Sequence, residues 1–319
     1  MTRLVFLVLL ASAVAGCASI ATPREVRVGS YNIRLATGDK GTPNAWELRR
    51  DALIAQIRRM NLDAFGLQEV RPEQAAFLRE RLPEFEFVGE HRGADRKSDE
   101  ASPVFFRKTR FEALKSGTFW LSETPEVPGK KGWGAACPRV CSWMWLRDRV
   151  TGRTFCFANT HTDHVSALAR KEGMLLIVRR MKEFGAGAPI VFTGDHNCRE
   201  NEEPAQAVSQ ILKNALYVTE TPPEGPWRTF TGWKYREKEY SAVDALKIPV
   251  GLRNARKGSP DAEKDATGEY KWEDCGPRID YIYVSPDVKV KSLRTWPDTR
   301  PGTTLYPSDH FPITATVEF

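Results

Sequence analysis

The sequence predicts an α/β fold in which mixed β-sheets are flanked by helices. Strand-like and helix-like segments appear in two rounds along the 319 residues, and each helix links strands. Short connections, such as the turn at residues 148–152, make several strand pairs antiparallel. The composition, 41% hydrophobic and 28% charged, is ordinary for a globular protein, and no position marks a boundary between two domains. We therefore expect one domain over residues 25–319.

The first half of the chain predicts strands at 25–34, 64–70, 85–88 and 102–107, and helices at about 46–60 and 73–82. The first strand alternates polar and apolar residues and carries Asn32 near its end. The first helix has apolar residues at helical spacing on one face, including Leu53 and Ile57. The second strand is apolar and reaches Glu69 at its polar end. Each of these strands thus delivers a polar side chain to its terminus.

The second half predicts a hairpin region over 111–157, further strands at 154–160, 190–192, 278–284, 288–295 and 313–319, and helices at about 166–184 and 203–213. The apolar stripe of the helix at 166–184 indicates core packing, and Gly185 ends that helix. Residues 234–274 are polar and charged without a clear period, which predicts an irregular insertion that acts as a functional lid or a flexible loop.

The N-terminal segment is typical of a signal peptide. A short positive start is followed by an apolar run at residues 4–15, and small residues precede Cys17. This run is too short for a membrane span, and the residues before Cys17 resemble a bacterial lipobox. Residues 1–17 therefore predict export, cleavage before Cys17 and lipid attachment to its thiol, with a plain secretory signal as the alternative. We expect an extracytoplasmic, periplasmic monomer tethered to the membrane by its lipid.

The remaining cysteines and the net charge exclude few classes of function. Five cysteines follow Cys17, and the pair Cys137 and Cys141 lacks the two-residue spacing of a zinc knuckle. A structural disulfide and buried free thiols both fit this pattern. The net charge of +6 fits a polyanionic substrate or an anionic membrane surface, but 41 acidic residues accompany 47 basic ones. The charge therefore does not require nucleic acid as a partner.

Eight polar residues lie in or near strands or strand ends, and they are the candidate site residues: Asn32, Glu69, His161, Asp195, Asn197, Asp280, Asp309 and His310. Four of the five histidines of the chain fall in these segments. A random scatter of histidines would seldom do that, so the pattern indicates a site rather than surface decoration. We expect these residues to converge on one site for metal-assisted cleavage of a phosphoester.

Six short motifs carry a resemblance to a known family, and they occur in its order at 30–34, 67–70, 159–161, 194–197, 278–282 and 308–312. With these motifs the chain resembles the endonuclease/exonuclease/phosphatase superfamily, the DNase I-like fold, over nearly its whole length. Segments 119–125 and 229–232 resemble an exported bacterial branch of it. The resemblance implies a four-layer αββα sandwich, with two packed mixed β-sheets flanked by helices, and phosphoester hydrolysis with a divalent metal.

The resemblance also implies the metal ligands. Glu69 matches the main metal carboxylate, Asn32 offers an amide oxygen beside it, and Asp309 offers a second carboxylate. Mg²⁺ prefers such oxygen ligands and keeps several waters, so one or two carboxylates suffice. We expect Mg²⁺ as the cofactor, with Mn²⁺ as an alternative. A metal in this place would polarise a phosphoryl oxygen and steady the leaving oxygen.

The other five residues take catalytic roles in this resemblance. His310 and Asp280 form an imidazole–carboxylate dyad, in which the acid fixes the tautomer and raises the basicity of the ring. Asp195 orients or deprotonates the attacking water. Asn197 and His161 donate hydrogen bonds to phosphoryl oxygens as charge builds. Each has a structural alternative; Asp280, for example, is also consistent with a carboxylate in a surface pair.

One residue departs from the family pattern, and the substrate stays open. The superfamily usually has an aromatic residue between Asp195 and Asn197, where this chain has His196. In an extended segment its side chain points to the opposite face, which predicts a hydrogen-bonded core residue, with a second metal ligand as the alternative. For function, the alternatives to a phosphodiesterase or phosphatase are an exported nuclease acting on DNA or RNA and a catalytically silent, membrane-tethered module that binds a phosphorylated ligand.

Overall fold

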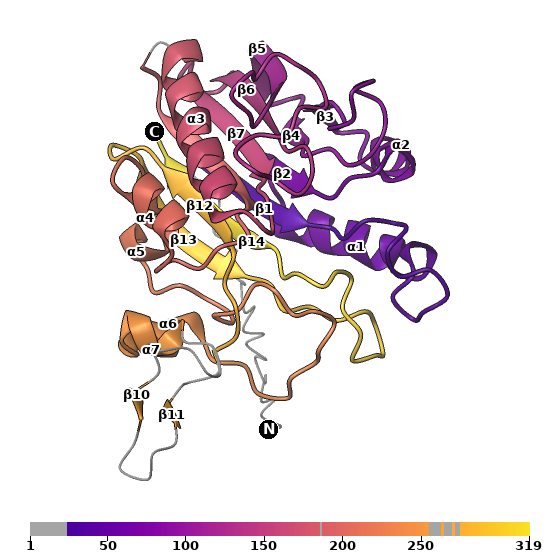
Figure 1. The fold of residues 1–319 in the computed structure, drawn as a ribbon, viewed down its shortest axis with the longest axis vertical. Helices are drawn as coiled ribbons and strands as arrows, with labels where there is room; N and C mark the ends of the chain where they lie inside the picture. The colour runs from indigo at the N-terminus through magenta and orange to yellow at the C-terminus, as the bar shows by residue number, and fades with distance from the viewer. Residues whose placement is uncertain (1–23, 186, 255–262, 265–269, 272–274) are drawn as a thin grey trace, which may run out of the picture.

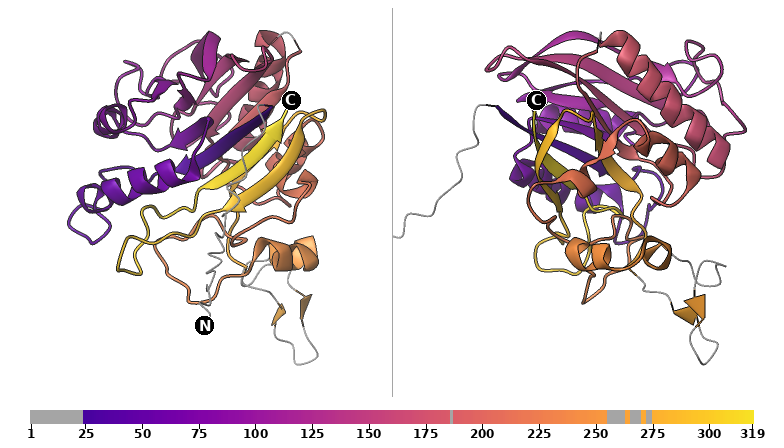
Figure 2. Two further views of the ribbon diagram at one scale, coloured as in Figure 1. Left: turned by 180° about the vertical axis from the view of Figure 1, so that it is seen from behind. Right: turned by 90° about the vertical axis from the view of Figure 1, so that its left-hand side faces the viewer.

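Two six-stranded β-sheets pack face to face, with helices on both outer sides (Figures 1 and 2). The computed structural model describes residues 24–185, 187–254, 263–264, 270–271 and 275–319. The predicted four-layer αββα sandwich is confirmed, whereas the predicted signal peptide at 1–17, with Cys17, lies outside the described residues. Within the described part of the chain, no helix combines the length and the apolarity that crossing a membrane requires.

The first sheet has the strand order β13-β14-β1-β2-β4-β3. Its strands are β1 (Glu25–Asn32), β2 (Ala64–Gln68), β3 (Phe85–Val88), β4 (Val104–Arg107), β13 (Lys289–Thr295) and β14 (Ile313–Glu318). β1 runs parallel to β2 and antiparallel to β14, which makes the sheet mixed. The helices α1 (Trp46–Met60) and α2 (Pro72–Arg81) flank this sheet, and they appear at the right of Figure 1.

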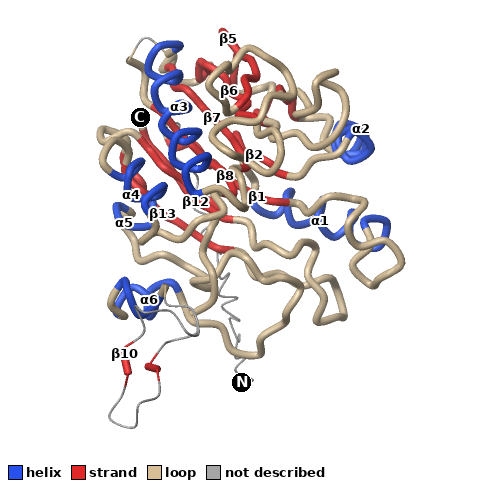
Figure 3. The backbone as a smooth tube through the Cα atoms, viewed as in Figure 1, coloured by secondary structure: helices blue, strands red, loops and turns tan. Residues whose placement is uncertain are grey.

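The second sheet has the order β5-β6-β7-β8-β12-β9. Its strands are β5 (Phe111–Trp120), β6 (Val140–Asp148), β7 (Thr154–His161), β8 (Ile190–Asp195), β9 (Lys213–Asn214) and β12 (Asp280–Val284). β7 and β8 are parallel, and β12 is antiparallel to β8. The helices α3 (Ala167–Phe184) and α4 (Glu203–Ser209) cover the outer face of this sheet, and the short α5 (Ala215–Val218) packs on the core between the two sheets; all three are shown in blue in Figure 3.

Each pair of neighbouring layers buries its own apolar cluster. Residues from both sheets, such as Val28 and Phe157, form the core between the sheets. Ile177 and other residues of α3 pack on the second sheet, which confirms that the apolar stripe of this helix is core. Leu53 and Ile57 of α1 pack on the first sheet. The helical and strand periodicities of the sequence thus correspond to the faces that are buried.

The buried amide of Asn159 joins the two sheets. The Asn159 side chain of β7 donates hydrogen bonds to the carbonyls of Leu67 (2.8 Å) and Pro103 (3.0 Å) and accepts one from Gln68 Nε2 (2.7 Å). Gly66 of β2 leaves the space for it, because a Cβ there would lie 2.1 Å from Asn159 Cγ. Since every donor and acceptor of this amide is satisfied, it fixes how the sheets are aligned.

The region predicted as an irregular insertion at 234–274 contains the helices α6 (Ala242–Lys247) and α7 (Val250–Arg253), and the short strands β10 (Glu263–Lys264) and β11 (Tyr270–Lys271). Residues 255–262, 265–269 and 272–274 of it lie outside the described residues. Arg253 is buried and donates from Nε to Glu200 Oε1 at 2.7 Å. This part of the insertion is therefore tied to the loop that follows β8.

Candidate active site

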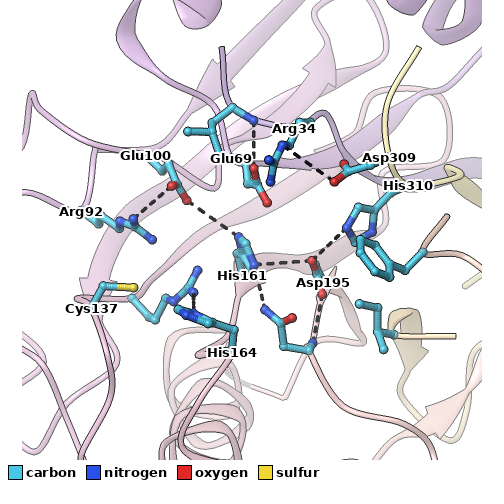
Figure 4. Close-up of a pocket in the computed structure, with 15 residues that line it drawn as sticks. Arg34, Glu69, Arg92, Glu100, Cys137, His161, His164, Asp195, Asp309 and His310 are labelled. Atoms are coloured by element: carbon cyan, nitrogen blue, oxygen red, sulfur yellow. Dashed lines mark hydrogen bonds and ion pairs between the residues drawn. The ribbon is translucent and has the colours of Figure 1, made fainter. Parts of the chain in front are cut away.

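The eight predicted site residues all lie at one end of the sandwich. Asn32, Glu69, His161 and Asp195 stand at or just after the carboxyl ends of four strands, in two parallel pairs, β1 with β2 and β7 with β8. The antiparallel strands β12 and β14 begin at that same end. Asp280 is the first residue of β12, and Asp309 and His310 lie just before β14. The register fixes this closely, because Asp195 lies opposite both His161 and Asp280. The predicted convergence is therefore observed, as Figure 4 shows for five of these residues.

Glu69 and Asn32 form one side of the site. The amide nitrogen of Asn32 donates to Glu69 Oε1 (3.0 Å) and to Asp195 Oδ2 (2.9 Å), and the Leu35 N–H donates to Glu69 Oε2 (2.8 Å). Glu69 has φ +63°, a left-handed backbone that a residue with a side chain adopts at a cost. The amide oxygen of Asn32 accepts from the Arg34 N–H (2.9 Å). Metal ligation by that oxygen thus stays a prediction. It requires the side-chain amide of Asn32 to flip, so that its oxygen and nitrogen exchange places.

His310 and Asp280 form the predicted dyad. Asp280 Oδ2 lies 2.9 Å from His310 Nδ1, while His310 Nε2 lies 3.6 Å from Asp195 Oδ2. Burial lowers the pKa of His310, but the carboxylates of Asp280 and Asp195 outweigh it and raise this pKa to about 10. Burial and the charge of Asp280 raise the pKa of Asp195 to about 7. His310 therefore carries both ring protons at neutral pH, and Asp195 is poised near neutrality.

His161 and Asn197 face Asp195 from the other side (Figure 4). The Asn197 amide nitrogen lies 2.9 Å from His161 Nε2, and that ring nitrogen lies 3.4 Å from Asp195 Oδ2. Asn197 has φ +47°, which turns its N–H onto Asp195 Oδ1 at 2.9 Å. Burial, with the nearby charge of Arg139, lowers the pKa of His161 well below its ordinary value. The neutral ring accepts from Asn197 at Nε2, so its proton is on Nδ1, 3.9 Å from Glu100.

Six of the eight predicted residues line a pocket of about 430 Å³, whereas Asn32 and Asp280 contact the lining residues Glu69 and His310 without lining it themselves. Nine further residues line the pocket that the sequence did not identify: Arg34, Leu35, Arg92, Glu100, Cys137, Arg139, His164, Phe230 and Ile279. Arg34 was within reach of the sequence, since it lies two residues after Asn32 in a motif, and its Nε is 3.8 Å from Asp309 Oδ2. Arg92 and Glu100 pair at 3.0 Å and come from a loop without periodicity. No pattern in that loop could have identified them.

The donor set of the pocket fits a hard cation. Three carboxylates, Glu69, Asp195 and Asp309, surround the site, and burial raises the pKa of Asp309 as well as that of Asp195. Carboxylate oxygens are the ligands that Mg²⁺ and Mn²⁺ prefer. Asp195, Asp280 and His310 also offer ligand atoms within 4.8 Å of one another. That second grouping differs from the predicted set of Asn32, Glu69 and Asp309, because it consists of Asp195 and the two residues of the proposed catalytic dyad.

His196 is a core residue, as the alternation of the strand predicted. Its ring stacks on Tyr283 at 5.6 Å and lies 4.8 Å from Phe192, and it takes no part in lining the pocket. The expectation of a hydrogen-bonded histidine was wrong, because neither ring nitrogen has a partner among the described residues. Burial lowers the pKa of His196 to about 3, so the ring is neutral.

The structure has free thiols at four cysteines that follow Cys17. Cys137, Cys141, Cys156 and Cys198 are not joined in disulfides, and three of them are buried. Burial raises the pKa of Cys156 to about 12, so this thiol is inert at neutral pH. Only Cys137, which is partly exposed, reaches the pocket. Of the two readings of the cysteine pattern, free thiols fit these four residues.

Comparisons with known proteins agree with this geometry. The profile of the Endonuclease/Exonuclease/phosphatase family matches residues 29–310. An endonuclease/exonuclease/phosphatase from Bacteroides vulgatus is 32% identical with TM-score 0.75, over 92% of this chain and 99% of that one. The mannosyl-6-phosphatase of Bacteroides thetaiotaomicron is 30% identical with TM-score 0.75, over 92% and 100%. Nocturnin of Drosophila melanogaster is 24% identical in an alignment 302 residues long that covers 86% of this chain and 42% of the relative. The chain thus spans less than half of that protein's length.

Proposed function

The chain belongs to the endonuclease/exonuclease/phosphatase family, a family of phosphoester hydrolases, and we propose that it is a divalent-metal-dependent phosphodiesterase or phosphatase. The observation that carries the proposal is the convergence of Glu69, Asp195, Asp309, His161 and His310 in one pocket. The ends of β7 and β8 and the segments after β2 and before β14 supply these side chains, and Glu69 and the neighbouring Asn197 hold left-handed backbone. Such an arrangement is costly for a fold and is typical of a site.

Glu69 and Asp309 are the proposed metal ligands, with Asn32 beside them, and Mg²⁺ is the proposed metal with Mn²⁺ as an alternative. When bound, the metal supplies a positive charge that polarises a phosphoryl oxygen and steadies the leaving oxygen. Asn32 also holds Glu69 and Asp195 in a fixed relation through its two hydrogen bonds. Such outer contacts orient the carboxylates before any ligand arrives.

Asp195 is the proposed base for the attacking water. Its pKa of about 7 leaves a large fraction ionised at neutral pH while keeping it basic enough to accept a proton. His310, doubly protonated and held by Asp280, stabilises the charge of Asp195 and of the phosphoryl oxygens. Asn197 and His161 are the proposed donors to those oxygens as negative charge grows. The Asn197 amide donates to His161 Nε2 and to the Thr162 carbonyl in this structure, so it would have to exchange one of these contacts for the substrate.

The pocket favours a small phosphoester or the end of a chain over the middle of a duplex. A volume of about 430 Å³ accommodates one sugar phosphate or nucleotide. The similarity to a mannosyl-6-phosphatase over nearly the whole chain supports this choice. A nuclease acting on DNA or RNA and a catalytically silent module that binds a phosphorylated ligand are the other candidates, and the test below separates all three.

We also propose that the protein is an exported, periplasmic lipoprotein of the family, monomeric and anchored through Cys17. The basis is the positive start, the apolar run and the small residues before Cys17. Mass spectrometry of the protein purified from membranes tests it. The proposal predicts a mature chain that begins at a lipid-modified Cys17, and a Cys17→Ser variant should leave the membrane fraction. An unprocessed chain or unmodified Cys17 would contradict it.

Hydrolysis of p-nitrophenyl phosphate and bis-p-nitrophenyl phosphate by the purified mature domain tests the activity. We expect turnover with Mg²⁺ or Mn²⁺ and none after chelation, and loss of turnover in Asp195→Ala. Absence of activity with Mg²⁺, Mn²⁺ and Ca²⁺, or activity unchanged in Asp195→Ala, would overturn the proposal. A substrate panel of sugar phosphates, inositol phosphates, nucleotides, sphingomyelin, DNA and RNA then identifies the substrate class.

A further inference from the structure

Arg49 of α1 is a completely buried arginine that lies beneath the loops of the site. Burial lowers its pKa to about 10, so it remains charged at neutral pH. Its guanidinium donates to five main-chain carbonyls: Ile33 (2.5 Å), Arg34 (2.7 Å), Leu35 (3.5 Å), Asn44 (3.0 Å) and Pro307 (3.1 Å). A guanidinium that binds so many carbonyls from distant segments acts as a fixed connector between them.

The carbonyls that Arg49 binds belong to the segments that hold the proposed metal ligands. Residues 33–35 directly follow Asn32, and the Leu35 N–H donates to Glu69 Oε2 at 2.8 Å. Pro307 lies two residues before Asp309. The next residue, Ser308, donates from Oγ to the Asn32 carbonyl at 2.7 Å. One buried cation therefore lies between the backbone beside Glu69 and the backbone beside Asp309.

Aromatic contacts connect Arg49 to a third segment of the chain, the one that contains Trp233. The Arg49 guanidinium lies 5.0 Å from the ring centre of Trp46 and 5.6 Å from that of Trp233. Just before Trp233, the N–H groups of Thr231 and Gly232 donate to the Asp309 carbonyl at 2.7 Å and 3.2 Å. A planar, delocalised cation suits this stacking and these forked hydrogen bonds, whereas the lysine ammonium is a point charge with three donors.

We propose that Arg49 is a positioning residue that fixes the distance between Glu69 and Asp309 and thereby sets the affinity of the site for its divalent metal. It contacts neither the pocket nor the proposed ligands directly, so it acts through their backbone. The inference rests on the metal-dependent function proposed above. The contrasting role, a buried arginine that only stabilises the fold, predicts no change in metal affinity in a folded variant.

The test compares Arg49→Lys and Arg49→Met with Arg110→Met. Arg110 is the matched control because it also clamps the backbone and acids of the first sheet, donating to Asp63 (2.9 Å) and the Glu25 carbonyl (2.6 Å), but at the opposite end of β1. Folding is checked by circular dichroism, and Mg²⁺ and Mn²⁺ affinity is measured by calorimetry without substrate. We expect the Arg49 variants to bind metal roughly 10-fold more weakly, the lower end of the range for a lost partner of a metal ligand, because Arg49 acts on the ligands through their backbone. Arg110→Met should bind it as the unmodified protein does.

Activity provides the second readout. The loss in Arg49→Lys should shrink as Mg²⁺ is raised, because the deficit lies in metal binding. Folded Arg49→Lys with metal affinity within threefold of the unmodified protein would overturn the inference, as would an equal weakening in Arg110→Met. Unfolding of both Arg49 variants would also overturn it, since the residue would then serve the fold. If the unmodified protein neither binds metal nor hydrolyses a phosphoester, the proposed function fails; if it does both and Arg49→Lys matches it, only the role of Arg49 fails.

Discussion

Substitution of His310 is the most direct test of the proposed chemistry. Its ring is buried between Asp280 and Asp195, so its charge is held by groups that belong to the site. His310→Ala should lower kcat by roughly 10²- to 10⁴-fold, the range for a lost proton-transfer or charge-stabilising group. Steady-state kinetics measures this, with His91→Ala as the control because His91 lies outside the pocket. Gross unfolding of His310→Ala, seen by circular dichroism, would instead make His310 a structural residue.

Because His196 is buried and neutral, we expect the protein to become less stable at acidic pH. Its pKa is about 3 in the folded protein and near 6.5 in an unfolded chain, so between these values the unfolded state binds more protons. The contribution of His196 to the free energy of unfolding is therefore highest above pH 6.5 and decreases as the pH falls. This decrease is about 2 kcal/mol between pH 8 and pH 5. His196→Phe should remove that part of the loss. Urea unfolding at both pH values measures it, and an identical pH dependence in the two proteins would contradict the argument.

At the scale of elements, the junction between β2 and β7 should tolerate almost no added volume. A Cβ at Gly66 would lie 2.1 Å from the Asn159 amide. That amide cannot move away without breaking the hydrogen bonds that hold it between the two sheets. Gly66→Ala should lower the free energy of unfolding by about 2–4 kcal/mol, as overpacking and a broken buried network do. Gly117→Ala in β5 is the control, since its nearest neighbour is Trp143 Nε1 at 3.2 Å. Equal losses in both variants would refute the special role of the junction.

The strands and most helices were predictable because their apolar periodicity corresponds to faces that are buried. The helix expected at about 203–213 shows where that failed: α4 ends at Ser209, and Lys213 and Asn214 pair with Tyr283 and Val284 instead. Strand pairing with a distant segment overrides local preference, and sequence periodicity contains no trace of it. Likewise, the motifs identified Asp195 and His310, but the loop arginine Arg92 reaches the pocket only through the path of the folded chain.

At the scale of the molecule, metal binding should be visible in the stability of the whole domain. A ligand that binds only the folded state at 100 times its Kd adds about 2.7 kcal/mol. Mg²⁺ should therefore raise the Tm, and chelation should reverse the rise. Glu69→Gln should lose most of this shift, because it removes a carboxylate charge from the pocket. Differential scanning calorimetry measures it; a Tm indifferent to Mg²⁺ in the unmodified protein would contradict a resident metal.

The direction of β1 bears on which molecules meet the catalytic end. This strand starts at Glu25 and runs eight residues to Asn32, so its start lies roughly 25 Å from the pocket. If Cys17 carries the proposed lipid, the anchor is attached on the side where β1 starts, which is the end of the sandwich opposite the pocket. The pocket then stays open to soluble phosphoesters of the compartment.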